Sequence, residues 1–282
     1  MRRRPSFARI LGGCVAVAGR GVTRLFGSRI GVRAAGHAAA SLAPVVTVTT
    51  ARGDLRFWCL TETGAKRALA ALRHEPDTLA WLDQYLGKGE HLWDVGANIG
   101  VYGLYACLRD EVTVTCFEPM ASTFAILARN ATLNGFSERI LPLYVALSDM
   151  TGIFPMHLSS LESGSSMHAL VKPENVRGAF DAEAVQLVPT ARGDMLVAQF
   201  GVRPAQHLKV DVDGHEAQVL EGMGTLLDNV RTVWIEMTAY GEATGENTRI
   251  RDILSAHGLV EHVFAPAQHS RNKLFVNSQK TG

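Results

Sequence analysis

The chain of 282 residues is long enough for one large domain, or for one domain with an appendage. Hydrophobic residues make up 47%, enough for a substantial core, and the formal net charge of +1 excludes a strong overall attraction to nucleic acid. The charge is uneven, because residues 1–53 contain nine arginines and no acidic residue. A basic arm therefore precedes an acidic remainder.

The N-terminal arm, residues 1–44, is predicted to be basic and poorly ordered. Its apolar stretch, residues 10–18, is too short for a bilayer span, which needs about 20 residues. A signal peptide, a mitochondrial transit peptide and a helix on anionic lipid are the alternatives. We expect a cytoplasmic protein in which this arm could make a peripheral membrane contact.

Residues 45–90 are predicted as an N-terminal extension of strands and helices. VVTVTT begins at Val45 with strand-like alternation, and RGDLRFWCL continues it. A helical apolar pattern covers 65–86, and Pro76 is expected to divide it into two helices.

Strand and helix patterns alternate from residue 91 to the end of the chain, which predicts an α/β fold with a parallel sheet covered by helices on both faces. The expected strands are 91–95, 112–117, 140–147, 206–212, 231–237, 259–264 and 272–277. The expected helices are 100–109, 121–134, 215–229 and 246–257.

Residues 155–190 interrupt this alternation. The stretch contains Pro155, Pro173 and Pro189, the sequence SSLESGSSMHAL and little periodicity. We interpret it as a long insertion loop over the ligand edge of the sheet, because long loops are often functional.

The four cysteines, Cys14, Cys59, Cys107 and Cys116, lack metal-ligand spacing such as CxxC. Their apolar neighbours predict buried free thiols, which suits a reducing compartment.

A glycine-rich turn, DVGANIG, follows the first strand of the main domain. The dinucleotide fingerprint GxGxxG would need glycine where the chain has Asn98 and Val101, and there is no P-loop GK[ST]. Asp94 before the turn suits a cationic ammonium, and a helix N-terminus suits a carboxylate, so S-adenosylmethionine fits. Gly96 and Gly100 would let the backbone approach this ligand; a structural turn without a ligand is the alternative.

Two further strand ends supply polar residues for the same ligand. Glu118 follows VTCF, 24 residues after Asp94, where an acid can accept hydrogen bonds from both ribose hydroxyls. Ser148 and Asp149 end the third strand, where adenine could lie. Each also has an ordinary interpretation, Glu118 as a solvated acid and Ser148–Asp149 as a loop opening.

The fourth strand carries KVDVDGHE, in which Lys209, Asp211 and Asp213 share one face of an extended segment. Buried charges are costly unless they are paired or functional, so this pattern indicates a site. Asp211, at the strand end, is the best candidate for substrate chemistry. Glu216 in the first turn of the next helix could simply favour the helix dipole.

These motifs together resemble the FkbM family of S-adenosylmethionine-dependent methyltransferases over residues 75–277. The matching stretches are DVGANIG at 94–100, FEP at 117–119, ALSD at 146–149, GDML at 193–196, KVDVDGHE at 209–216 and VLEGM at 219–223. The family commonly has glutamate where this chain has Asp213. The resemblance implies a Rossmann-like methyltransferase domain, residues 91–282. It has a seven-stranded, mostly parallel sheet whose last strand is antiparallel. It also implies O-methylation of a sugar or polyketide-like hydroxyl.

For this reaction, Asp211 is the candidate base that takes the hydroxyl proton, with His215 or an acid of the 155–190 segment behind it. His157 and His168 in the 155–190 segment are weaker candidates. We expect the cofactor residues to be Asp94, Gly96, Asn98, Gly100, Glu118, Ser148 and Asp149.

No resident metal is expected, although Asp211, Asp213 and Glu216 could gather Mg²⁺ in an alternative mechanism. The expected substrate is a small molecule, a glycan or a lipid. A non-catalytic methyltransferase-like interaction module, a nicotinamide-dependent oxidoreductase and a nucleic-acid methyltransferase are the competing classes. The missing GxGxxG, the acidic main domain and the lack of an NPPY-type motif argue against the last two.

Overall fold

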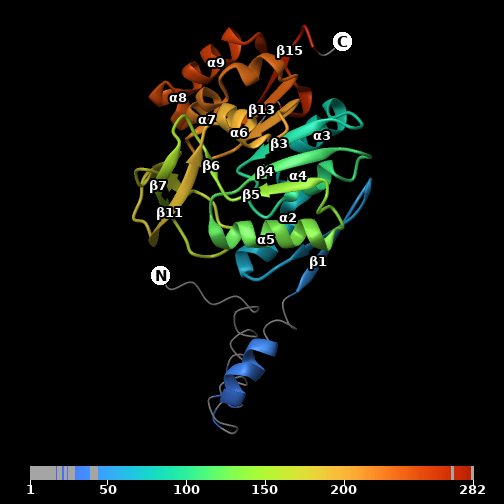
Figure 1. Ribbon diagram of the computed structural model, residues 1–282, viewed down its shortest axis with the longest axis vertical. Coiled ribbons are helices and arrows are strands. Elements are labelled where there is room, and N and C mark those ends of the chain that lie inside the picture. Colours follow the sequence, from blue (N-terminus) through green and yellow to red (C-terminus); the bar gives the residue numbers. More distant parts are fainter. Residues whose placement is uncertain are drawn as a thin grey trace. The chain divides into compact units, whose positions relative to one another are not determined.

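The computed structural model describes residues 44–267 and 270–280, a helix over residues 29–38, and residues 17, 21 and 24 (Figure 1). The chain forms two compact units, Met1–Pro44 and Val45–Gly282. Most of the basic arm, with Cys14, therefore lies outside the described residues. Within the described part, no helix is both long enough and apolar enough to cross a bilayer.

A seven-stranded sheet forms the centre of the second unit, in the order β14-β15-β13-β12-β3-β4-β5. Neighbours are parallel, except that the last strand, β15, runs antiparallel to both β13 and β14. The strands are β3 (His91–Val95), β4 (Thr113–Phe117), β5 (Ile140–Leu143), β12 (His207–Val210), β13 (Thr232–Glu236), β14 (Leu259–His262) and β15 (Asn272–Asn277). The predicted seven-stranded α/β fold is confirmed.

Helices cover both faces of this sheet because successive strand residues point to opposite sides. On β3, Leu92 belongs to one buried cluster and Trp93 to the other, and on β13 Trp234 and Ile235 divide in the same way. The helices of the domain are α4 (Val101–Ala106), α5 (Ala121–Leu133), α6 (Gly193–Phe200), α7 (Glu216–Met223), α8 (Ala239–Thr244) and α9 (Glu246–Ala256). Short 3-10 helices cover Gly224–Asn229 and Ala265–Ala267.

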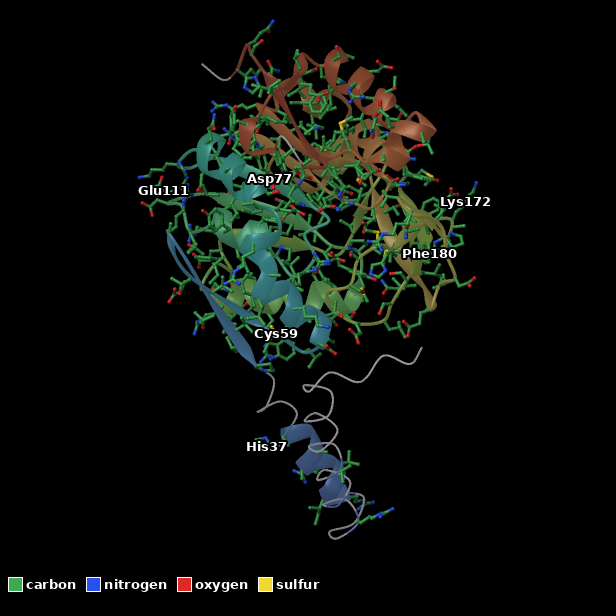
Figure 2. All side chains as sticks on the ribbon, turned by 180° about the vertical axis from the view of Figure 1, so that it is seen from behind. His37, Cys59, Asp77, Glu111, Lys172 and Phe180 are labelled. Carbon is green, nitrogen blue, oxygen red and sulfur yellow. The ribbon has the colours of Figure 1, made fainter. Side chains whose placement is uncertain are left out.

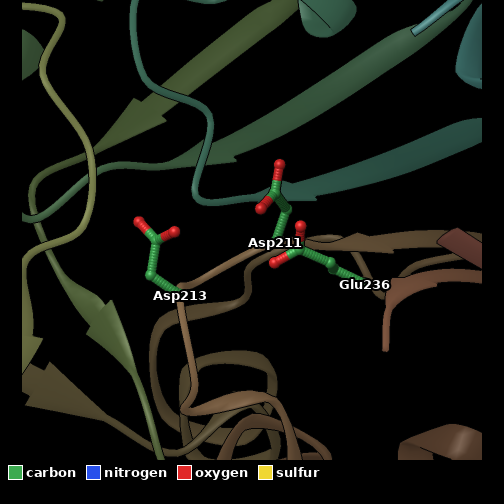
Figure 3. A group of neighbouring side chains, drawn as sticks. All are labelled: Asp211, Asp213 and Glu236. Atoms are coloured by element: carbon green, nitrogen blue, oxygen red, sulfur yellow. The ribbon is translucent and has the colours of Figure 1, made fainter. Parts of the chain in front are cut away.

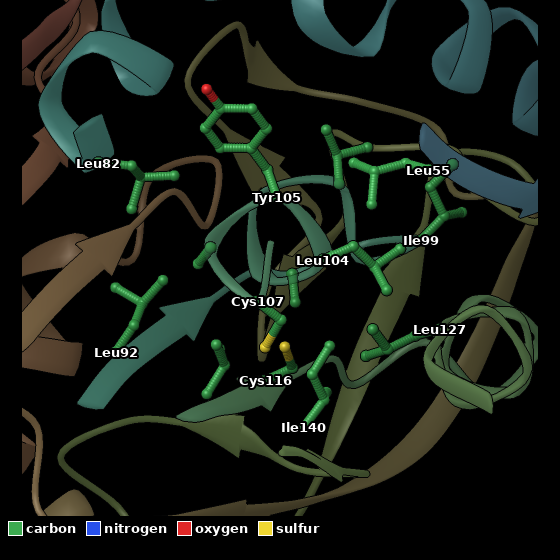
Figure 4. Packing of buried hydrophobic residues seen from close by; sticks show 14 of the residues in the cluster. Leu55, Leu82, Leu92, Ile99, Leu104, Tyr105, Cys107, Cys116, Leu127 and Ile140 are labelled. Atoms are coloured by element: carbon green, nitrogen blue, oxygen red, sulfur yellow. The ribbon is translucent and has the colours of Figure 1, made fainter. Parts of the chain in front are cut away.

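The first buried cluster contains the cysteines (Figure 4). Cys107, at the end of α4, and Cys116, on β4, lie among Leu92, Leu104 and Ile140. Both are free and buried, as is Cys59, which confirms the prediction for these three residues. Burial raises the pKa of the Cys107 thiol to about 12, so this thiol is unreactive near neutral pH.

Residues 155–190 form part of a second sheet, so the prediction of a long irregular loop is wrong. The sheet has the order β6-β11-β7-β8, and Lys172 and Phe180 lie on the segment between β8 and β11 (Figure 2). Pro155 lies in β7 just before the residues that pair with the outer strand β8. Pro189 lies in β11 just before the residues that pair with the outer strand β6. A missing N–H is tolerated at both positions. The strands are β6 (Ala146–Leu147), β7 (Gly152–Leu158), β8 (Ala169–Leu170) and β11 (Ala184–Ala191), with a small hairpin of β9 (Glu174–Asn175) and β10 (Gly178–Ala179).

The N-terminal extension consists of the hairpin β1 (Val45–Thr50) and β2 (Gly53–Trp58), followed by α2 (Glu62–His74) and α3 (Pro76–Tyr85). The Thr61 side chain caps α2 by accepting a hydrogen bond from Gly64 N at 3.0 Å. Pro76 occupies the first turn of α3, where no N–H is needed. The predicted division into two helices at Pro76 is confirmed.

Two stacked indoles join this extension to the main sheet. The rings of Trp81 on α3 and Trp234 on β13 lie 5.7 Å apart at an angle of 10°. Trp81 Nε1 donates to Thr232 Oγ1 at 3.1 Å, and Trp234 Nε1 donates to Thr78 Oγ1 at 2.9 Å. Both indoles are therefore buried with their N–H groups satisfied, which fixes α3 against β13.

Trp81→Ala is expected to lower the free energy of unfolding by about 3–5 kcal/mol, because it empties a buried indole site and removes the donor to Thr232. Leu69→Ala on α2 is the control, since Leu69 is 62% exposed, and it should change stability by less than about 0.5 kcal/mol. Urea unfolding followed by circular dichroism measures both. Equal losses in the two variants would contradict this role for Trp81.

Candidate functional site

The candidate site lies at the carboxyl ends of β3, β4, β12 and β13. The chain leaves β3 toward β4 on one side, whereas β12 and β13 lie on the other, and ligands bind where strand order reverses in this way. Two cavities of about 750 and 330 Å³ open here. Both are lined by Arg67, Glu75, Gly96, Asn98, Asp211, Glu236 and Arg271, so they adjoin each other.

The two glycines of the turn make room for protein atoms. Gly96 has φ +79°, and a Cβ there would lie 1.9 Å from the carbonyl oxygen of Asp211. Gly100 has φ +90°, and its Cβ would lie 2.6 Å from Leu127 Cδ1. The glycines therefore let β3 and α4 pack against β12 and α5. Gly96 also lines both cavities, so close approach of a ligand to this turn stays a prediction.

Asp94 lies beneath the turn with 0% of its surface exposed. Its Oδ2 accepts a hydrogen bond from Gly103 N at 3.1 Å, and its Oδ1 is 3.9 Å from Lys209 Nζ. Burial raises the pKa of Asp94, and Lys209 opposes that rise. Asp94 does not line either cavity, so its contact with a ligand ammonium stays a prediction.

Glu118 holds the glycine turn and faces the smaller cavity. Its Oε2 accepts from Asn98 N at 2.9 Å and its Oε1 accepts from Met120 N at 2.8 Å. Asn98 has φ +51°, and its Nδ2 donates to the carbonyl of Ser165 at 2.8 Å. Burial raises the pKa of Glu118 to about 7, against the lowering effect of both N–H donors. Each carboxylate oxygen can accept a further hydrogen bond from a ligand hydroxyl.

Ser148 and Asp149 lie behind the cavity wall. Ser148 is fully buried and its Oγ donates to Asp149 Oδ1 at 2.9 Å. Ser148 Oγ also lies 3.1 Å from Nε2 of His215. Burial lowers the pKa of His215. The smaller cavity is lined there by the preceding residues, 145–147, and by His215. An adenine contact from Ser148 or Asp149 therefore stays a prediction, and no described hydrogen bond joins His215 to Asp211.

Lys209 is a buried cation under the site, 2% exposed. Its Nζ lies 3.2 Å from Asp211 Oδ2 and 5.0 Å from the centre of the Tyr102 ring. Burial alone would lower the pKa of Lys209, but Asp211 and Asp94 raise it above its usual value. Asp211 is about one-third exposed and lines both cavities. It is thus the acid of this group that a ligand can reach.

Asp213 and Glu216 have different surroundings despite their closeness in sequence. Asp213 has φ +59°, its Oδ2 accepts from Met167 N at 2.6 Å, and burial raises its pKa to about 6. Both oxygens of Glu216 accept from the backbone N–H of Val212 or Gly214, at 3.1–3.2 Å. Glu216 is therefore a buried cap of this turn and does not line either cavity.

The structure brings in several residues that sequence reasoning did not select. Arg67 and Glu75 come from the N-terminal extension, Glu236 ends β13, and Arg271 precedes β15. Glu236 had a usable signal, because it ends the buried run TVWIE at the same sheet edge as Asp94 and Asp211. His168 lines the smaller cavity, where burial lowers its pKa to about 4. His157, by contrast, does not line either one.

The sequence matches the family model described as the methyltransferase FkbM domain over residues 94–260, more than half of the chain. It is 31% identical over 218 residues to the hexuronic acid methyltransferase AglP of Haloferax volcanii, covering 69% of this chain and 84% of that protein. It is 30% identical over 196 residues to the 31-O-demethyl-FK506 methyltransferase FkbM of Streptomyces tacrolimicus, covering 61% and 74%.

Among solved structures, the chain resembles the precorrin-6y C5,15-methyltransferase of Geobacter metallireducens with a TM-score of 0.40. The two are 8% identical, and the match covers 66% of this chain and 73% of the other.

Gly96→Ala is expected to cost about 1–3 kcal/mol more unfolding free energy than Gly135→Ala. Both glycines have similar positive φ, +79° and +74°, so the backbone strain of adding a Cβ is matched. Only at Gly96 would the Cβ meet another atom, the Asp211 carbonyl, whereas Gly135 has open space. Urea unfolding of both variants measures the difference, and equal stabilities would refute the close contact.

Proposed function

Because the chain belongs to the FkbM family of methyltransferases, we propose that it transfers a methyl group from S-adenosylmethionine to a hydroxyl group of a sugar, glycan, lipid or secondary metabolite. The observation that carries the proposal is Glu118 in the wall of the smaller cavity, hydrogen-bonded to the glycine turn. An acid in this place suits a ribose diol. The larger adjoining cavity leaves room for an acceptor.

The chemistry of the smaller cavity suits this cofactor better than a phosphate-bearing one. Five acidic residues line it against three arginines, so the lining on balance repels phosphate and attracts a sulfonium or an ammonium. An apolar wall, residues 145–147 with Phe117 and Met156, can enclose an adenine ring. The backbone N–H groups of Asn98, Ile99 and Gly100 donate within the protein, so a contact of this turn with the cofactor carboxylate stays a prediction.

In the proposed reaction, S-adenosylmethionine supplies a methyl group whose bond to the positively charged sulfur breaks, with the electron pair left on sulfur, as the oxygen–carbon bond forms. Asp211 takes the proton of the acceptor hydroxyl, because it is a partly exposed acid that lines both cavities. Lys209 holds the Asp211 carboxylate in place through the 3.2 Å contact. His215, hydrogen-bonded to Ser148, anchors the end of the turn that follows Asp211.

The relatives support a hydroxyl acceptor of sugar or metabolite type. One is named as a methyltransferase of hexuronic acid and another as a methyltransferase of 31-O-demethyl-FK506. Arg67 and Arg271 line both cavities and could pair with a carboxylate, as on a uronic acid. We therefore extend the proposal to acceptors that carry an acidic group near the methylated hydroxyl.

S-adenosylhomocysteine is expected to raise the melting temperature of the full chain, and NADH is not. Glu118→Gln should weaken S-adenosylhomocysteine binding by about tenfold or more, because the neutral amide replaces one strong acceptor. Glu183→Gln, at an exposed acid of the second sheet region, is the control. A shift with NADH alone would favour an oxidoreductase, and no shift with either compound would favour a non-catalytic interaction module.

Asp211→Asn is expected to lower turnover about 100-fold or more, because the amide cannot take a proton. Its affinity for S-adenosylhomocysteine should stay within a few fold. The acceptor for this assay is found by incubating the enzyme with labelled S-adenosylmethionine and fractionated glycans, lipids and metabolites, and detecting the added methyl by mass spectrometry. Asp252→Asn on the exposed side of α9 is the control. Full activity of Asp211→Asn would remove Asp211 as the base.

A further inference from the structure

Three carboxylates converge where the two cavities meet. Asp211 and Asp213 follow β12, and Glu236 ends the neighbouring β13 (Figure 3). One oxygen atom of each lies within 4.8 Å of the others. Asp211 and Glu236 line both cavities, so the group is open to whatever occupies them.

Glu236 gives an independent indication that something is bound here. The residue is only 7% exposed, and its Oε1 is paired with Arg271 Nη2 at 3.0 Å. Its Oε2 is buried and has no hydrogen-bond partner among the described residues. A buried, unpaired carboxylate oxygen is costly, so an oxygen kept in this state beside two further acids points to a ligand.

The ion pairs described for these three carboxylates involve only two of them. Lys209 contacts Asp211, and Arg271 contacts Glu236. Asp213 has a backbone donor, Met167 N, but no described ion pair. Like charges so close together repel each other, and a bound cation would offset that repulsion.

The geometry points to a binding site for one divalent cation, Mg²⁺ or Mn²⁺, whose ligands are Asp211, Asp213 and Glu236. Hard divalent cations take carboxylate oxygens. Ligand bonds of about 2.1 Å place neighbouring oxygens of an octahedron about 3.0 Å apart and opposite ones about 4.2 Å apart. The carboxylate oxygens of the three residues lie within 4.8 Å of one another, so small side-chain movements would bring them to these separations.

This site differs from the alternative set that the sequence suggested. Glu216 is excluded because its two oxygens already accept backbone hydrogen bonds. Glu236, 23 residues beyond Asp213 in the chain, replaces it through the pairing of β12 with β13.

The remaining coordination positions would face the cavities and take oxygens of the acceptor. Ligation lowers the pKa of a bound hydroxyl, so the cation would orient the acceptor and reduce what is required of Asp211 as a base. Only this role rests on the proposed methyl transfer. Binding of the cation can be tested without cofactor or acceptor, so failure of one proposal is distinguishable from failure of the other.

Mn²⁺ titration of the full chain, followed by electron paramagnetic resonance, tests the site directly. We expect saturable binding of one Mn²⁺ that Mg²⁺ displaces. Glu236→Gln and Asp213→Asn should each weaken Mn²⁺ binding more than about tenfold, and Asp252→Asn should leave it unchanged. Circular dichroism and urea unfolding report whether the variants are folded. Absence of saturable binding, or unchanged binding in both folded variants, would overturn the proposal.

Iron-directed cleavage of the unmodified chain locates the site without any variant. Fe²⁺ bound in place of Mg²⁺, with ascorbate and peroxide, cuts the backbone next to the metal. We expect cuts near residues 211–213 and 236, suppressed by excess Mg²⁺ and mapped by mass spectrometry. Cuts only elsewhere would overturn the assignment, even if the two variants do not fold.

Discussion

The buried cation of Lys209 is the constraint on which the site depends. Desolvating an ammonium group is costly, and here the cost is offset by Asp94 on one side and Asp211 on the other. Because β12 pairs with β3, these contacts fix the end of β12 against the glycine turn. The same pairing brings the Asp211 carbonyl close to Gly96. The ion pair with Lys209 and this close packing together place Asp211 where the two cavities meet.

Most of the main sheet could be predicted from the sequence because its strands are buried on both faces. HLWDV and TVWIE read as apolar runs and lie within one residue of the predicted bounds. Helices α6 and α8 were missed, because with eight and six residues they are too short to establish a helical period from the sequence alone. The second sheet was missed because its prolines argued against strands. Pro155 and Pro189 pair between β7 and β11, but on their outer sides the registers of β8 and β6 begin only at the next residue, so the missing N–H is tolerated.

The site was predictable in part. Spacing along the chain identified Glu118 and Asp211 as residues at strand ends, and both line the cavities. Spacing could not show that Ser148 turns inward to His215, or that Glu216 is consumed by the backbone of its own turn. Arg67 reaches the site only through tertiary contacts of the N-terminal extension, and such contacts leave no local pattern in a single sequence. Glu236 was overlooked, although it ends the buried run TVWIE at the same sheet edge.

The hydrogen bond from Asn98 Nδ2 to the Ser165 carbonyl joins the glycine turn to the segment that follows β7. Asn98 also donates its backbone N–H to Glu118, and residues 165–170 line the same cavity. A ligand that orders the turn in this cavity would therefore also order that segment, because Asn98 joins the two. Ordering of the turn and ordering of residues 165–170 are thus coupled, and by linkage a change that loosens one of them weakens ligand binding at the other.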